Sequence, residues 1–110
     1  MNILLDESAL RLIKTRLPQF SIRTVQEMGW AGMKNGELST VGEGQFDVFV
    51  TADKMLRYQQ NLTGKRLAVV VLPSNQVPVV TALLPAIARV LKDIQPGAAI
   101  EIPMPLAPGK

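Results

Sequence analysis

Apolar residues gather in short runs along this chain, and polar segments rich in glycine and proline separate them. The runs at 2–5, 21–25, 47–51 and 67–72 predict β-strands, and a shorter run at 99–102 predicts a last one. The run LAVVVL at 67–72 is apolar at every position, which is typical of a strand covered on both faces of a parallel sheet. The run at 21–25 alternates apolar and polar residues, which is typical of an edge strand.

The segments between these runs carry the spacing of helices. Shorter helices are expected from Ser8 to Leu17, from about Asn35, and over 54–62. Pro85 lies inside the longest helical pattern and is expected to bend or interrupt it, because a proline ring clashes with the carbonyl four residues earlier. That pattern repeats apolar residues at three- and four-residue steps: Val80, Leu83, Leu84, Ile87, Leu91 and Ile94.

Strands that alternate with helices over 110 residues predict one α/β domain. We expect a three-layer sandwich around a mostly parallel sheet of four or five strands, joined by right-handed crossovers. The domain is expected to cover residues 1–102. Residues 103–110, PMPLAPGK, are rich in proline and are expected to form a flexible tail.

The amino-acid composition limits the kinds of catalysis that this chain could carry out. Cysteine and histidine are both absent, so thiolate nucleophiles, disulfides and imidazole bases are excluded. Hydrolysis would then need carboxylates, lysine or serine, or a hard cation such as Mg²⁺ or Mn²⁺. A net charge of +3 favours an anionic partner such as nucleic acid. No apolar run reaches about 18 residues and no signal-peptide pattern is present, so we expect a soluble cytoplasmic protein without membrane contact.

Acidic residues follow two of the predicted strands. Asp6 comes after the first strand and Asp53 after the third. If the second and third strands lie on opposite sides of the first, both acids flank the crevice where ligands of such sheets collect. Two carboxylates this close repel each other unless one is protonated or a cation lies between them. Each acid could instead cap a helix or a turn.

The other acidic residues have no such placement. Asp47 begins the third strand and is expected at the opposite end of the sheet, in a solvated turn. Four others are interpreted as surface charge: Glu27, Glu43, Asp93 and Glu101.

The segments ILLDES, TVQEMGW-GMKNGEL, FDVFVTADKMLRYQQNL and AVVVLP resemble the compact, toxin-type bacterial members of the PIN-like nuclease family. The resemblance extends to about Gly97. It implies a PIN-like fold, a ribonuclease that holds Mg²⁺ or Mn²⁺ on carboxylates, and a toxin that a cognate antitoxin silences. By position it implies Asp6, Glu37 and Asp53 as metal ligands and catalytic residues. The chain differs from the family at Ser8, where asparagine is usual, and has no fourth acid shortly after Asp53.

Lys54 and Arg57 stand one helical turn apart and are candidates for binding the substrate phosphates. A solvated helix face is the alternative interpretation of this pair. RNA is the expected substrate, and the apolar surface of the longest helix suits an antitoxin or a second copy of the chain. Trp30 and Tyr58 could stack on bases, but packing in the core or at an interface is the preferred interpretation.

Two rival functions stay open. The first is a non-catalytic PIN-like module that binds a protein, with its acids kept as caps. The second is a phospho-acceptor receiver domain, which also has an acidic pair after the first strand, an aspartate after the third and a hydroxyl after the fourth, here Ser74. A receiver needs a lysine after the fifth strand, whereas this chain has Ile102 and Pro103 there and no lysine before Lys110.

Overall fold

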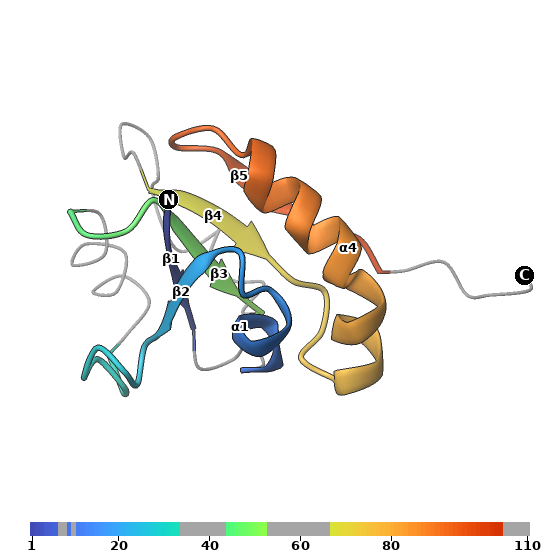
Figure 1. Ribbon diagram of the computed structural model, residues 1–110, viewed down its shortest axis with the longest axis horizontal. Coiled ribbons are helices and arrows are strands. Elements are labelled where there is room, and N and C mark those ends of the chain that lie inside the picture. The colour runs from blue at the N-terminus through green and yellow to red at the C-terminus, as the bar shows by residue number, and fades with distance from the viewer. Residues whose placement is uncertain (7–8, 10, 34–43, 53–66, 105–110) are drawn as a thin grey trace, which may run out of the picture.

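The computed structural model describes residues 1–6, 9, 11–33, 44–52 and 67–104. In these ranges five strands form one sheet in the order β2-β1-β3-β4-β5, and every pairing is parallel (Figure 1). The α/β fold with a parallel sheet is therefore confirmed, and each strand ends within one residue of its predicted limits. The strands are β1 (Asn2–Leu5), β2 (Ser21–Thr24), β3 (Val48–Thr51), β4 (Ala68–Val71) and β5 (Ala99–Glu101).

The strand order reverses next to β1. The chain passes from β1 to β2 on one side and later returns to place β3 on the other side. The registers pair Ile3 with Ile22 on β2 and with Val48 on β3, so β1 is hydrogen-bonded along both edges. Doubly wound sheets bind ligands at such a reversal, at the carboxyl ends of the strands. β2 and β3 therefore lie on opposite sides of β1, which is the arrangement expected to bring Asp6 towards the end of β3.

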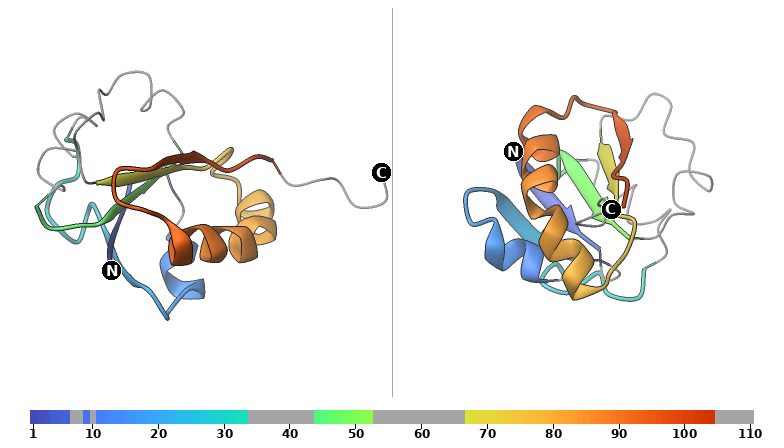
Figure 2. Two further views of the ribbon diagram at one scale, coloured as in Figure 1. Left: turned by 90° about the horizontal axis from the view of Figure 1, so that it is seen from above. Right: turned by 90° about the vertical axis from the view of Figure 1, so that its right-hand side faces the viewer.

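One face of the sheet is covered by α1 (Leu12–Arg16) and α4 (Val77–Asp93), which lie side by side in both views of Figure 2. Ile13 and Ile87 are fully buried against Ile3 and Val50 in this layer. α1 is shorter than the predicted helix, which was expected to begin at Ser8, a residue outside the described ranges.

Pro85 was expected to bend or interrupt the long helix, and the interruption is not found. α4 continues through Pro85 for 17 residues without a break. The reason is the position of the proline: it lies on the exposed side, while the buried side holds an unbroken apolar stripe. Proline has no amide hydrogen, so the helix loses one hydrogen bond at Pro85. The stripe packs against the sheet before and after that point and keeps the helix continuous. Its members are Val80, Leu83, Ile87 and Leu91.

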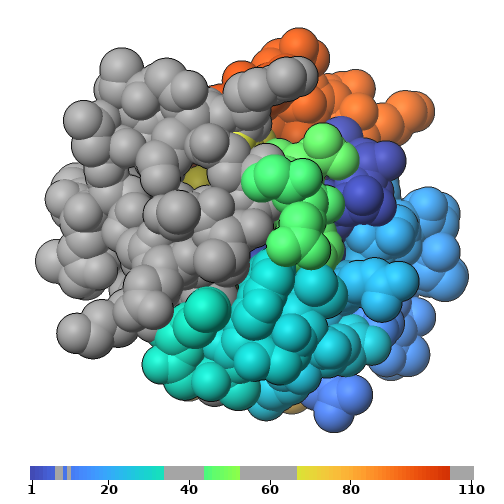
Figure 3. Space-filling view, turned by 90° about the vertical axis from the view of Figure 1, so that its left-hand side faces the viewer, coloured from blue at the N-terminus to red at the C-terminus, as the bar shows by residue number. Residues whose placement is uncertain are grey.

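The opposite face of the sheet buries a second apolar cluster centred on Phe49, Val69 and Val71. The segment that follows β2 packs on it, and Figure 3 shows this segment (cyan) beside the segment that begins at Gly44 (green). Trp30 meets Phe46 edge to face, with ring centroids 6.0 Å apart. Trp30 is half-buried and packs against the second cluster, which agrees with the preferred interpretation of packing in the core or at an interface. The helices expected on this face, from about Asn35 and over 54–62, lie outside the described residues, as does Tyr58.

The sheet ends at β5, and Ile102, directly after it, is the last buried residue of the described chain. Its amide donates to the carbonyl of Val71. Pro103 and Met104 are exposed, and residues 105–110 lie outside the description. Among the described residues, no helix combines the length and the apolar character that crossing a membrane requires.

Candidate functional site at the carboxyl edge of the sheet

Asp6 lies directly after β1, at the carboxyl edge of the sheet, and only 8% of it is exposed. Its amide donates to the carbonyl of Val50 on β3 at 2.9 Å, which continues the β1–β3 ladder by one residue. Its carbonyl accepts from the amide of Ala9 at 3.0 Å. Hydrogen bonds at both its amide and its carbonyl thus position the main chain of Asp6 beside the end of β3.

Thr51, the last residue of β3, holds this carboxylate. Its hydroxyl donates to Asp6 Oδ2 at 2.8 Å, and the residue is completely buried. A buried hydroxyl without a partner is costly, so the two groups satisfy each other. The carbonyl of Thr51 accepts from the amide of Leu72 at 2.7 Å. The carboxyl ends of β1, β3 and β4 are therefore joined by hydrogen bonds around Asp6.

Of the predicted site residues, the structure describes Asp6 alone. The other predicted metal ligands, Glu37 and Asp53, lie outside the described residues, and so do Lys54 and Arg57. Among the residues that are described, no three acidic side chains come together in a way that could hold a metal ion. The three-carboxylate site therefore stays a prediction.

Thr51 was not singled out by the sequence analysis, although a signal was present. It is the polar residue that ends an otherwise buried apolar strand, directly before Ala52 and Asp53. A hydroxyl in such a place needs a buried acceptor. Which acceptor it finds depends on β1 lying next to β3, and only the tertiary structure supplies that.

The opposite edge of the sheet carries Asp47, as predicted. The residue is exposed, and its Oδ2 accepts a hydrogen bond of 2.7 Å from the amide of Asn2. A surface cleft of about 740 Å³ lies at this amino edge, with Phe46, Val48 and Ile94 in its wall. Figure 3 shows the start of the chain (dark blue), the residues before β3 (green) and the end of α4 (orange) meeting there. This cleft thus lies at the end of the sheet away from Asp6.

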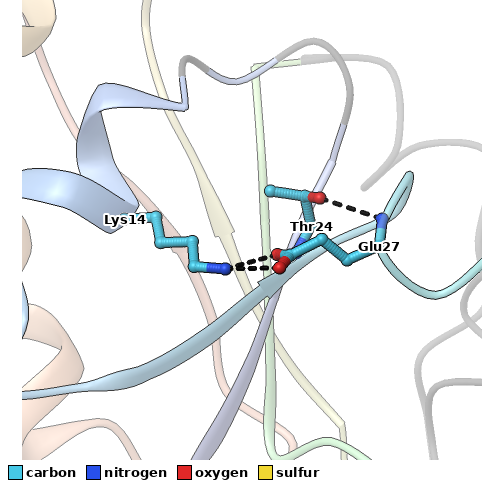
Figure 4. A network of polar contacts seen from close by, with 3 residues as sticks. All are labelled: Lys14, Thr24 and Glu27. Atoms are coloured by element: carbon cyan, nitrogen blue, oxygen red, sulfur yellow. Dashed lines mark hydrogen bonds and ion pairs between the residues drawn. The ribbon is translucent and has the colours of Figure 1, made fainter.

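Glu27 is exposed, as expected, but it is not an isolated surface charge. Both of its carboxylate oxygens accept from Lys14 Nζ at 2.6 Å, and Oε1 also accepts from the amide of Thr24 at 2.8 Å (Figure 4). The Thr24 hydroxyl accepts in return from the amide of Glu27 at 3.1 Å. The hydrogen bond from Lys14 and then that from Thr24 lower the pKa of Glu27 from 4.5 to about 2.

The sequence contained the signal for part of this network. Thr24-Val25-Gln26-Glu27 has the spacing of a capping box, in which a threonine and a glutamate three residues later exchange hydrogen bonds. Here the exchange closes the turn after β2 and the ion pair attaches that turn to α1. The network lies at the carboxyl end of β2, where Thr24 pairs with Leu5, the residue before Asp6.

The described candidate site is thus a buried carboxylate held by a buried hydroxyl, at the reversal point of a parallel sheet. Oxygen donors of this type bind hard cations, and the position is the one at which doubly wound sheets take ligands. Comparisons with models of protein families, with curated proteins and with solved structures found no match to this chain.

Proposed function

We propose that this chain is a PIN-like ribonuclease that depends on Mg²⁺ or Mn²⁺, with its site at the carboxyl edge of the sheet between β1 and β3. The observation that carries the proposal is the hydrogen bond between Thr51 and Asp6, because it holds a buried carboxylate of one strand against the end of the next. This place coincides with the reversal of strand order, where the crevice of a doubly wound sheet forms.

Asp53 is the second proposed ligand, and it follows Thr51 by two residues. Two peptide units span at most about 7 Å between Cα atoms, so covalent geometry alone ties Asp53 to the neighbourhood of the residue that holds Asp6. Two neighbouring carboxylates favour a cation between them over mutual repulsion. Glu37 is proposed to complete the set, on the resemblance to the family.

In this proposal Asp6, Glu37 and Asp53 bind the cation through their carboxylate oxygens. The bound ion would supply an activated water and would neutralise charge on the phosphodiester. Thr51 acts as a positioning residue, since its hydrogen bond orients the Asp6 carboxylate without touching the substrate. The absence of histidine fits a reaction in which no imidazole base takes part.

RNA is the proposed substrate, with Lys54 and Arg57 binding its phosphates. The net charge of +3 favours such a polyanion. An antitoxin or a second copy of the chain is proposed as the protein partner, and the apolar surface of α4 would supply the contact. Val77, at the start of that helix, is 56% exposed.

The direct test is a Mn²⁺ titration followed by thermal unfolding. Wild type is expected to gain stability with rising Mn²⁺, because an ion that binds only the folded state shifts the equilibrium towards it. Asp6→Asn and Asp53→Asn should lose this response. Asp93→Asn removes one exposed carboxylate from the end of α4 and serves as the matched control. An equal response of all four proteins would contradict the metal site.

A second assay separates a nuclease from a protein-binding module. A mixed pool of RNA is incubated with the protein in Mn²⁺, with and without a chelator. Cleavage that needs Mn²⁺ and is lost in Asp53→Asn supports the proposal. Absent cleavage with intact Mn²⁺ binding would leave the non-catalytic PIN-like module as the function.

One observation favours a second candidate, the phospho-acceptor receiver. The order β2-β1-β3-β4-β5 is the one found in receiver and flavodoxin-like sheets. Against it, β5 is followed by Ile102 and Pro103 instead of a lysine, and the Ser74 hydroxyl already accepts from the amide of Gln76 at 3.0 Å. Incubation with a small phosphodonor decides the matter: a stable mass increase of one phosphoryl group on Asp53 would replace the nuclease proposal.

A further inference from the structure

An open groove lies between α4 and the strand into which it leads, β5 (Figure 1). Its volume is about 380 Å³, and most of its lining is apolar: Val90 and Ile94 from the helix, and Ala98 and Ile100 from the strand side. Three of these four side chains are only half-buried, although they pack against the core of the α4 layer. The groove therefore leaves apolar surface in contact with solvent at one end of the sheet.

The outer edge of β5 lies beside this groove. β5 is last in the strand order, and among the described residues its neighbour is β4 alone. The carbonyl of Ala98 accepts from Val69 at 2.8 Å, and the amide of Ile102 donates to Val71 at 2.9 Å. Main-chain groups of successive residues point to alternate sides of a strand, so the amide and carbonyl of Ala99 point away from β4. An edge of this kind pairs with a further strand when one is offered.

Two opposite charges stand on the rim of the groove. Arg89 and Asp93 are exposed, lie one helical turn apart on α4 and both line the groove with Val90. Neither side chain forms an ion pair within the part of the chain that the structure describes. An arginine that precedes an aspartate by four residues is in the less favourable order for a pair within one helix. The rim thus carries one charge of each sign, about 6 Å apart along the helix axis.

We infer that the groove and the edge of β5 bind a second copy of this chain about a two-fold axis. An axis that passes between the levels of Arg89 and Asp93 brings the arginine of each copy opposite the aspartate of the other, so the surface is complementary to itself. The same rotation makes the two β5 strands antiparallel neighbours, to which Ala99 brings a donor and an acceptor. A different protein would have to present a matching pair of charges, whereas a second copy already carries it.

This inference rests on the proposed function for the expectation that α4 meets a protein partner, and it names the side of the helix and the partner. It does not involve the proposed metal ligands. Asp6 follows β1, which is separated from β5 by β3 and β4 in the sheet. The dimer contact and the metal site can therefore be lost independently of each other.

The test is the dissociation constant of the dimer, measured by sedimentation equilibrium over a series of concentrations. Arg89→Asp and Asp93→Arg each set like charges against each other and should raise the constant at least about tenfold. The double variant Arg89→Asp/Asp93→Arg exchanges the signs and restores the match, so its constant should return to within about threefold of wild type. Lys92→Asp makes the same change of charge as Arg89→Asp on an exposed residue of α4 outside the groove, and should alter the constant less than about twofold.

The strand edge has a variant of its own. Ala99→Pro removes the amide that points away from β4 and should raise the dissociation constant about tenfold. Its midpoint of thermal unfolding, measured at a concentration at which wild type is monomeric, should change little, because proline is tolerated in an edge strand. A folded Ala99→Pro that dimerises as wild type does would overturn the pairing of β5.

The inference is overturned by a wild type that is monomeric at about 1 mM, where even weak specific contacts associate. Such a result would assign the groove to a different protein. Equal losses in Arg89→Asp and Lys92→Asp, or a double variant that stays as weak as the single ones, would also overturn it.

The Mn²⁺ titration keeps this inference apart from the proposed function. Asp6→Asn should dimerise as wild type does, and Arg89→Asp should keep the Mn²⁺ response. A wild type that dimerises through this surface but ignores Mn²⁺ would overturn the nuclease proposal alone. A monomeric wild type that responds to Mn²⁺ would overturn the dimer alone.

Discussion

The Thr51 hydroxyl donates a hydrogen bond of 2.8 Å to Asp6 Oδ2 across 45 positions of the sequence. Thr51 ends a buried strand and Asp6 directly follows another, and the pair joins a hydroxyl donor to a carboxylate acceptor. The pair closes the sheet at its reversal point and fixes where the carboxylate lies. Stability and the proposed chemistry therefore depend on the same contact.

Replacing Thr51 by valine tests this contact. Thr51→Val keeps the shape of the side chain but removes one hydrogen-bond donor from a buried carboxylate. The free energy of unfolding is expected to fall by about 1–3 kcal/mol. Thr51→Ser, which keeps the hydroxyl, should fall by less, about 1 kcal/mol, through the lost methyl group. Urea denaturation measures both, and a valine variant as stable as wild type would show that the bond contributes nothing.

Glu27 predicts a dependence of stability on pH. Its pKa in the folded protein, about 2, lies below its ordinary value of 4.5, so the folded state favours the ionised form. The stabilisation is complete above the ordinary value and is lost as pH falls towards about 2. Wild type should therefore lose its advantage over Glu27→Gln in thermal midpoint between about pH 5 and pH 2.

The cause of this shift can be checked separately. Lys14→Met should return the pKa of Glu27 towards 4.5, as NMR titration of the carboxyl carbon would show. Salt should diminish the difference in the pKa of Glu27 between wild type and Lys14→Met, because the side chains of Lys14 and Glu27 are both more than a third exposed. A Glu27 pKa that stays near 2 without Lys14 would assign the shift to Thr24 instead.

Pro85 is expected to cost stability in α4. Pro85→Ala restores the hydrogen bond to the carbonyl of Thr81 and removes a steric conflict, so the free energy of unfolding should rise by about 2 kcal/mol after allowance for the more flexible unfolded chain. Pro78→Ala is the matched control, since Pro78 occupies the first turn of the same helix, where proline is tolerated. The control should change stability by less than about 1 kcal/mol. Chemical denaturation of the three proteins gives the comparison, and a destabilised Pro85→Ala would mean that the proline is required.

The α4 layer is expected to carry much of the stability. Ile87 is completely buried on the stripe that faces the sheet, so Ile87→Ala should lower the free energy of unfolding by about 2–5 kcal/mol through lost burial and the cavity left behind. Val77→Ala, in the same helix but 56% exposed, should change it by less than about 0.5 kcal/mol. Similar losses in both variants would contradict the assigned orientation of the helix.

Much of the fold could be predicted because its signals are local. A strand such as LAVVVL and a helix such as α4 are each specified by the spacing of apolar residues within one segment. Pro85 shows where local reasoning failed. Its effect on the chain depends on whether the ring faces solvent and on how firmly the rest of the helix is packed, and neither can be known from one segment.

The candidate site, like the fold, could be predicted from the sequence only in part. Asp6 could be placed at a strand end from sequence, and its position at the carboxyl edge is confirmed. Thr51 and Lys14 could not be assigned their partners, because a hydrogen bond or an ion pair between distant residues requires knowledge of which elements are neighbours.

The sequence by itself determined the α/β class, the five strands and the long helix, because burial imposes a period on each segment that can be recognised without its neighbours. Only the tertiary structure decided that β1 lies between β2 and β3, and hence that Thr51 meets Asp6 and that the reversal point falls beside that carboxylate. Strand order depends on the packing of the whole chain, since the same apolar strands could be arranged in several orders with their hydrophobic faces equally well covered.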